Sequence, residues 1–187
     1  GVLLLVVLVT PELARAQFLT SIAVTPADPT IGVGQSQAFT ATGTFSNGSI
    51  RRLYGSLLAA GTDHSCAVLS DGTVQCWGWN ENGQLGNGTF IDSLTPVAVV
   101  NVAGAEAIAA GYAHTCVIWR DAAPISLEGT VQCWGLNATG ELGNGTLVDS
   151  ATPVPVSGIT TAVAITAGAD HTCALLADGS IRCWGYN

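Results

Sequence analysis

The chain has 187 residues, and 48% of them are apolar, which is enough for one moderate domain or for a few repeats that share a core. Thirteen acidic residues stand against five arginines and no lysine, so the net charge is −8. A surface with so few cations cannot follow a phosphate backbone, and this composition argues against nucleic-acid binding.

The N-terminal segment 1–16 predicts a secretory signal peptide. An apolar run over 1–9 is too short to span a bilayer, and the small-x-small sequence Ala14-Arg15-Ala16 follows it. Because neither an initiator Met nor a basic stretch precedes the run, we expect the natural chain to begin further upstream. No other segment approaches the length of a membrane-spanning helix. The sequence therefore predicts an exported protein, secreted or at the cell surface, with no membrane span in the mature chain.

Residues 17–52 predict a few short strands. Apolar residues alternate with small ones over 22–24 and again over 38–45, and the tight-turn pair Asn47-Gly48 follows. The segment resembles the opening half of a bacterial immunoglobulin-like domain of group 2, a kind found in adhesins and cell-surface proteins. The second half of that domain is absent, which leaves open whether these strands fold alone or pack against the next segment.

From residue 53 onward the chain repeats one unit, over 53–102, 103–159 and, incompletely, 160–187. Each unit has a small apolar strand, the sequence Gly-x-x-His and a hairpin bounded by two cysteines; in the first two units a glycine-rich loop follows. The histidines lie 50 and 57 residues apart, and an insertion in the second hairpin accounts for the difference. A period of this length indicates a solenoid, a propeller or an array. Short strands between turn signals, without helical periodicity, predict all-β blades.

The six cysteines predict three local disulfides. Ser70-Asp71-Gly72 is typical of a three-residue hairpin loop that pairs Leu69 with Thr73, and this register places the two cysteines of the first unit opposite each other unless a bulge shifts it. Export would place them in an oxidising compartment. A zinc site is the competing interpretation, but no Cys-x-x-Cys occurs and each unit offers only two Cys and one His. The expected pairs are Cys66–Cys76, Cys116–Cys133 and Cys173–Cys183.

The repeated histidines His64, His114 and His171 are predicted to be structural. A catalytic triad needs residues that converge in space, whereas neighbours such as Asp63, His64 and Ser65 alternate between the faces of a strand. We expect each histidine to hydrogen-bond a neighbouring strand or loop. The sequence Asn-x-Asn-Gly in the first glycine-rich loop lacks the ligand spacing of a calcium site, and we interpret it as a set of turn formers.

Tryptophans occur in two classes. Those that follow the second cysteine of each unit are predicted to lie in the core or between blades, with ligand stacking as a secondary role: Trp77, Trp134 and Trp184. Trp79 and Trp119 have no equivalents in the other units. Trp119 adjoins the insertion, and insertions in repeats map to loops that often bind partners. The candidate binding loop is therefore Trp119, Arg120 and Asp121, with an inert surface loop as the alternative.

The repeats resemble the regulator of chromosome condensation repeat family. The resemblance covers residues 53–187 through Ala-Ala-Gly-x-x-His-x-Cys, Asp-Gly-x-Val-x-Cys-Trp-Gly and Gly-Gln/Glu-Leu-Gly. It implies a β-propeller with one four-stranded blade per repeat and about seven blades in a closed ring. The expected fold is all-β, a partial β-propeller of about three blades preceded by a few immunoglobulin-like strands. Because three blades cannot close such a ring, we expect the chain to be part of a longer protein.

Three functions are consistent with these features. The first is an exported, non-catalytic module that binds a protein or a surface glycan through the loops on one face, without a cofactor or a metal. The second, implied by the family's best-known member, is guanine-nucleotide exchange on a small GTPase. The third is a targeting module for an extracellular enzyme whose catalytic domain lies beyond Asn187. We expect the first, because export and disulfides separate the chain from an intracellular GTPase.

Overall fold

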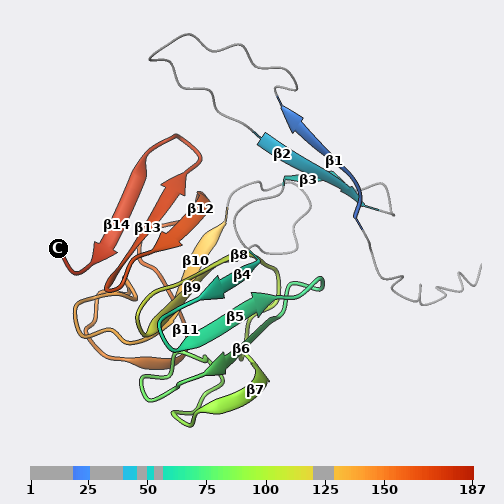
Figure 1. Cartoon of the computed structure of the whole chain (residues 1–187). Coiled ribbons are helices and arrows are strands. Elements are labelled where there is room, and N and C mark those ends of the chain that lie inside the picture. Colours follow the sequence, from blue (N-terminus) through green and yellow to red (C-terminus); the bar gives the residue numbers. More distant parts are fainter. Residues whose placement is uncertain (1–18, 26–39, 46–49, 53–56, 120–128) are drawn as a thin grey trace, which may run out of the picture. The chain divides into compact units, whose positions relative to one another are not determined.

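The computed structural model describes residues 19–25, 40–45, 50–52, 57–119 and 129–187, and the chain divides into two compact units at Leu53. The described residues form antiparallel strands and loops without a helix, so the all-β prediction is confirmed (Figure 1). Within these residues there is consequently no helix of the length and hydropathy needed to cross a membrane. The predicted signal peptide lies outside the described residues.

The first unit contains a three-stranded sheet in the order β1–β2–β3. Its strands are β1 (Leu19–Thr25), β2 (Thr40–Phe45) and β3 (Ile50–Arg52). The strand expected over 22–24 lies within β1, and β2 lies within the strand expected over 38–45, whereas β3 was not predicted. The resemblance of this segment to an immunoglobulin-like domain stays a prediction.

The second unit consists of three antiparallel meanders, which we call blades I, II and III. Blade I has β4 (Leu58–Ala60), β5 (His64–Val68), β6 (Val74–Gly78) and β7 (Ser93–Ala98). Blade II has β8 (Ala105–Ala110), β9 (His114–Trp119), β10 (Thr130–Gly135) and β11 (Ser150–Pro155). Blade III has β12 (Ala162–Ala167), β13 (His171–Leu176) and β14 (Ile181–Gly185). Strand β8 packs against β4 and β5, and β12 packs against β8 and β9, so consecutive blades stack face to face (Figure 1).

The hairpin of blade I follows from its turn chemistry. Gly72 adopts a φ of +80°, and the Leu69 amide donates to the Thr73 carbonyl at 2.8 Å. Glycine reaches this conformation without steric cost, which fixes the register of the hairpin. Cys66 consequently lies directly opposite Cys76.

The fourth strand of blades I and II, β7 and β11, forms the outer edge of its sheet. Strand β7 contains Pro96, and β11 contains Pro153 and Pro155. Proline has no amide hydrogen to give to a neighbouring strand, so it is tolerated at an edge and not in the middle of a sheet. The Thr-Pro-Val sequence thus lies in the edge strand of blades I and II.

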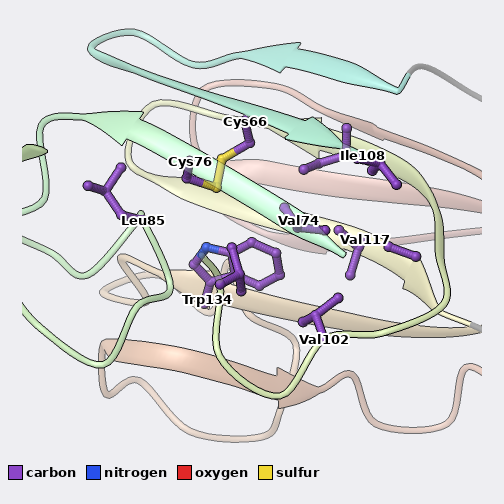
Figure 2. Close-up of a cluster of buried hydrophobic side chains, with 11 residues drawn as sticks. Cys66, Val74, Cys76, Leu85, Val102, Ile108, Val117 and Trp134 are labelled. Atoms are coloured by element: carbon purple, nitrogen blue, oxygen red, sulfur yellow. A yellow bond between two sulfur atoms is a disulfide. The ribbon is translucent and has the colours of Figure 1, made fainter. Parts of the chain in front are cut away.

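The hydrophobic core lies between the blades. One cluster joins blade I to blade II, where Trp134 of β10 packs with Leu85 and the Cys66–Cys76 disulfide of blade I and with Ile108 and Val117 of blade II (Figure 2). A second cluster joins blade II to blade III through residues such as Ile118, Leu142, Ile159 and Ala174. Neither core belongs to one repeat alone, which is why the repeats depend on one another for stability.

Candidate functional site

The repeated histidine connects each blade to the next. His64 begins β5, and its Nε2 lies 2.8 Å from Thr115 Oγ1 on β9 of blade II. His114 begins β9, and its Nε2 lies 2.8 Å from Thr172 Oγ1 on β13 of blade III. All four side chains are buried. The partner of each buried histidine is therefore a threonine of the following blade.

The proton of His64 can be placed from its partner. The Thr115 hydroxyl donates to the Gln84 carbonyl at 3.1 Å. A hydroxyl has one proton to donate, so it accepts at its other contact, and His64 carries its proton on Nε2. The Nδ1 atoms of His64 and His114 are buried without a hydrogen-bond partner. Adding a proton there would create a buried charge on an atom that has no hydrogen-bond acceptor.

Burial keeps both histidines neutral. Burial, together with the lesser effect of the neighbouring His114, lowers the pKa of His64 to about 4. Burial also lowers the pKa of His114 to about 4 against the opposing effect of Glu141 and Asp170. At neutral pH these imidazoles are uncharged hydrogen-bonding groups inside the blade junctions, which is a structural role and not that of a general base. The third histidine, His171, is exposed on blade III.

The repeated tryptophan adds a second link between blades. Trp134 is fully buried, and its Nε1 donates to the Gln84 carbonyl of blade I at 2.9 Å. Trp184 of blade III donates in the same way to the Glu141 carbonyl of blade II at 2.8 Å. Gln84 and Glu141 hold the same position in the Gly-Gln/Glu-Leu-Gly loop. The loop of one blade thus accepts the indole of the next, while Trp77, at the first position, is half-buried.

The cysteines form one disulfide within each blade. The pairs are Cys66–Cys76, Cys116–Cys133 and Cys173–Cys183, each with a Cα–Cα distance of 4.1 Å. The first two are fully buried in the cores between blades, and Cys183 of the third is exposed. Each disulfide joins the second strand of its blade to the third.

Buried asparagines hold the glycine-rich loops. The Asn80 amide donates to the carbonyls of Thr89 at 2.9 Å and Ile91 at 3.0 Å, and its oxygen accepts from the Leu85 amide at 2.8 Å. Asn137 makes the equivalent contacts in blade II. From the sequence, Asn80 is interpreted as a turn former. Its buried side chain holds the two ends of the loop together through these hydrogen bonds. No group of His, Cys, Asp and Glu side chains with the geometry of a metal site occurs in the part of the chain that the structure describes.

An open hollow of about 380 Å³ lies beside the junction of blades I and II, lined by Asp63, Trp79 and Tyr112. We call it the aromatic cleft. Asp63 lies in the β4–β5 loop, Trp79 follows β6, and Tyr112 lies in the β8–β9 loop of blade II. The rings of Trp79 and Tyr112 meet edge to face, with centroids 6.3 Å apart and planes at 73°. The Trp79 amide donates to the Asp63 carbonyl at 2.8 Å, which holds the two loops together.

Sequence reasoning found this cleft only in part. It noted that Trp79 has no equivalent, but it did not single out Tyr112, and it considered Asp63 only as a neighbour of His64. The available signal was that Trp79 and Tyr112 differ from the residues at the equivalent positions of the other repeats. The order of the strands in the blades brings the ends of β6 and β8 to the same side. The predicted loop at Trp119 is a different region: the Trp119 indole donates to the Ala103 carbonyl, and Arg120 and Asp121 lie outside the described residues.

The comparisons with known proteins agree with this geometry. Family models for the regulator of chromosome condensation (RCC1) repeat match residues 71–118 and 128–175, and a second model of the same repeat matches 56–84. The chain belongs to the RCC1 repeat family. Its His–Thr and Trp–carbonyl links are thus junctions between RCC1 blades.

Curated relatives match the blade-forming unit. The chain is 33% identical over 135 residues to the ultraviolet-B receptor UVR8 of Arabidopsis thaliana, covering 70% of this chain and 29% of that protein. It is 33% identical over 141 residues to protein pim1 of Schizosaccharomyces pombe, covering 68% and 24%. It is also 33% identical over 133 residues to the probable E3 ubiquitin-protein ligase HERC3 of Homo sapiens, covering 68% and 12%. The chain therefore spans less than a third of each of these relatives.

Solved structures show the fold. Human WBSCR16 aligns with a TM-score of 0.59 at 18% identity, covering 79% of this chain and 42% of that chain. Yeast RCC1 (Prp20), in its complex with Kap60, aligns with a TM-score of 0.56 at 21% identity, covering 78% and 40%. The chain shares its fold with yeast RCC1, so the prediction of a partial propeller is confirmed.

Proposed function

We propose that this chain is a non-catalytic protein-interaction module, and that the side of the blades bearing the aromatic cleft is its contact surface. The observation that carries the proposal is the cleft itself, in which two aromatic rings and a carboxylate line one open hollow. Aromatic side chains with a polar neighbour at a concave surface are typical of binding sites for protein partners.

The contrast between buried residues at the blade junctions and exposed residues at the cleft supports this proposal. The repeated His64, His114 and Trp134 are buried and committed to blade junctions. Tyr112 and Asp63, by contrast, are exposed beside those junctions. A rigid scaffold that presents variable loop residues at one side is the usual way in which repeat proteins bind partners.

The relatives also support a protein partner. Yeast Prp20 has been crystallised with Kap60 bound, and a separate study of its structure concerns its binding to Gsp1p and histones. Those partners are properties of Prp20, and this chain covers 40% of it. For this chain we propose only the general function, which is recognition of another protein. Nucleotide exchange on a GTPase and targeting of an enzyme remain the alternatives.

Export is the second part of the proposal. It is supported by the apolar N-terminal sequence and by the three disulfide-bonded cysteine pairs, which an oxidising compartment would preserve. An intact-mass measurement of the natural protein under non-reducing conditions tests this part. A mass with all six thiols free would contradict it.

Site-specific photo-crosslinking tests the interaction surface. A photo-reactive amino acid in place of Tyr112 should give discrete covalent adducts with protein in the cells or medium of the source organism. The matched control carries the same group in place of Leu94, which is 95% exposed on the edge strand β7. Equal adducts at both positions, or adducts at neither, would contradict the proposal. A nucleotide-release assay with small GTPases tests the exchange alternative on the same preparation.

A further inference from the structure

We propose that the aromatic cleft binds a single cationic side chain, best an arginine, presented by the partner protein. This inference rests on the proposed function and names the chemistry of its contact. The residues that carry it are Asp63, Trp79 and Tyr112.

The cleft offers both elements that a guanidinium needs. The Asp63 carboxylate is exposed and has no hydrogen-bond or ion-pair partner among the described residues. Trp79 and Tyr112 both line the hollow and meet edge to face, so they do not form one flat platform. A guanidinium can stack on an aromatic face and at the same time donate two parallel hydrogen bonds to a carboxylate.

The charge around the cleft favours a cation. In the described part of the second unit nine acidic residues stand against one arginine, Arg182, which lies on β14 of blade III. The nearest blades, I and II, contribute no described cation to oppose a positive ligand. This field raises the local concentration of basic partners and accelerates their association.

Blade II has the same backbone hydrogen bond as blade I but different side chains at the positions of the cleft. The amide after the β10 strand, Leu136, donates to the Ala113 carbonyl at 2.8 Å, as Trp79 does to Asp63. Alanine and leucine therefore replace the carboxylate and the indole at the equivalent positions without changing the local hydrogen bond. This hydrogen bond therefore does not depend on the side chains of Asp63 and Trp79, which leaves them available to a ligand.

Blade III repeats the pairing of an acid with an aromatic residue. Tyr186 donates through its amide to the Asp170 carbonyl at 2.8 Å, and Tyr186 is 70% exposed. The combination is thus present in blades I and III and absent from blade II. A neutral sugar would also stack on the aromatic rings and donate hydroxyl hydrogen bonds to the carboxylate, but it gains nothing from the negative charge around the cleft, so we favour the cation over a glycan.

Nuclear magnetic resonance of the whole chain provides the test. The probe is an acetylated, amidated pentapeptide of glycines with one central arginine, followed through the indole resonances of the five tryptophans. We expect the Trp79 indole to shift in a saturable way and the buried Trp134 indole to stay in place. Replacing arginine by citrulline, which is neutral and of similar shape, should weaken binding at least tenfold. Raising the salt concentration should weaken it as well.

The control variant comes from the chain itself. Asp63→Ala with Trp79→Leu installs the residues of blade II, so the protein should stay folded and lose arginine binding. Equal binding of the citrulline peptide, or no shift of Trp79 with either peptide, would overturn the proposal. A shift of Trp79 with a neutral oligosaccharide alone would overturn it in favour of a glycan.

The two proposals can fail separately. If crosslinking at position 112 captures protein but the arginine peptide does not bind, the interaction surface stands and the cationic ligand is wrong. If the arginine peptide binds but no protein is crosslinked there in the source organism, the cleft chemistry stands and the interaction function is wrong.

Discussion

Acidification from pH 7 to pH 5 should weaken the junctions between blades. His64 and His114 have a pKa of about 4 in the folded chain, below their ordinary value of 6.5. The unfolded chain therefore binds more protons between pH 6.5 and pH 4, and the free energy of unfolding falls as the pH falls through this window. Above pH 6.5 the contribution is fully present, and below pH 4 it is lost.

The two pKa values set the magnitude. A difference of two to three pKa units corresponds to about 3 kcal/mol per histidine at complete loss. At pH 5 the unfolded imidazole is almost fully protonated and the folded one is not, so about 2 kcal/mol is lost for each. The chain as a whole should lose about 4 kcal/mol between pH 7 and pH 5 through these two groups.

Urea unfolding followed by tryptophan fluorescence measures this loss. In His114→Gln, whose amide can still donate to Thr172, the loss between pH 7 and pH 5 should fall to about 2 kcal/mol. His171→Gln changes an exposed side chain and should retain the full loss. A wild-type chain that keeps its stability at pH 5, or a His114→Gln variant as acid-sensitive as wild type, would refute the assignment of these histidines to neutral, buried links.

Three further predictions concern the same junctions. Gly86→Ala places a methyl group 2.7 Å from Trp134 Nε1. It should lower the free energy of unfolding by about 1–3 kcal/mol more than Gly145→Ala, because Gly145 also has a positive φ but no atom within 4 Å of the added methyl group. Equal losses in urea unfolding would mean that the indole does not approach Gly86. Thr115→Val removes the acceptor of His64 and should lower the free energy of unfolding by about 1–3 kcal/mol, whereas Thr115→Ser should restore most of it; the prediction fails if both variants behave alike. Mild reductant followed by maleimide labelling should modify the blade III cysteines first, because the other two disulfides are fully buried, and mass spectrometry showing uniform labelling would contradict this order.

The sequence was sufficient for the blades because their signals are local. The turn at Gly72 fixes the hairpin, and the hairpin fixes which cysteines face each other. The edge strands β7 and β11 were harder to predict from the sequence, because Pro96 and its equivalent Pro153 are typical strand breakers unless they lie at the edge of a sheet. The His64–Thr115 link could not be foreseen, because a repeat pattern does not say which residue of the next blade meets the histidine.

The cleft shows a second limit of sequence reasoning. Asp63, Trp79 and Tyr112 come from two repeats, and only the stacking of blade II on blade I brings them to one hollow. Departures from the repeat were the available clue, since a residue that the junctions need should recur in each unit. That clue marks Trp79 but does not say which neighbours it will have.

The central claim is that residues repeated in every blade hold the blades together, while residues that depart from the repeat are available for binding. Comparing the free energy of unfolding of Trp79→Leu with that of Trp134→Leu tests it most directly. Trp79 is half-buried and blade II uses leucine there, so its replacement should cost less than about 1 kcal/mol. Trp134 is fully buried in the core between blades and donates to Gln84, so its replacement should cost at least about 2 kcal/mol. Equal losses for the two variants would contradict the claim.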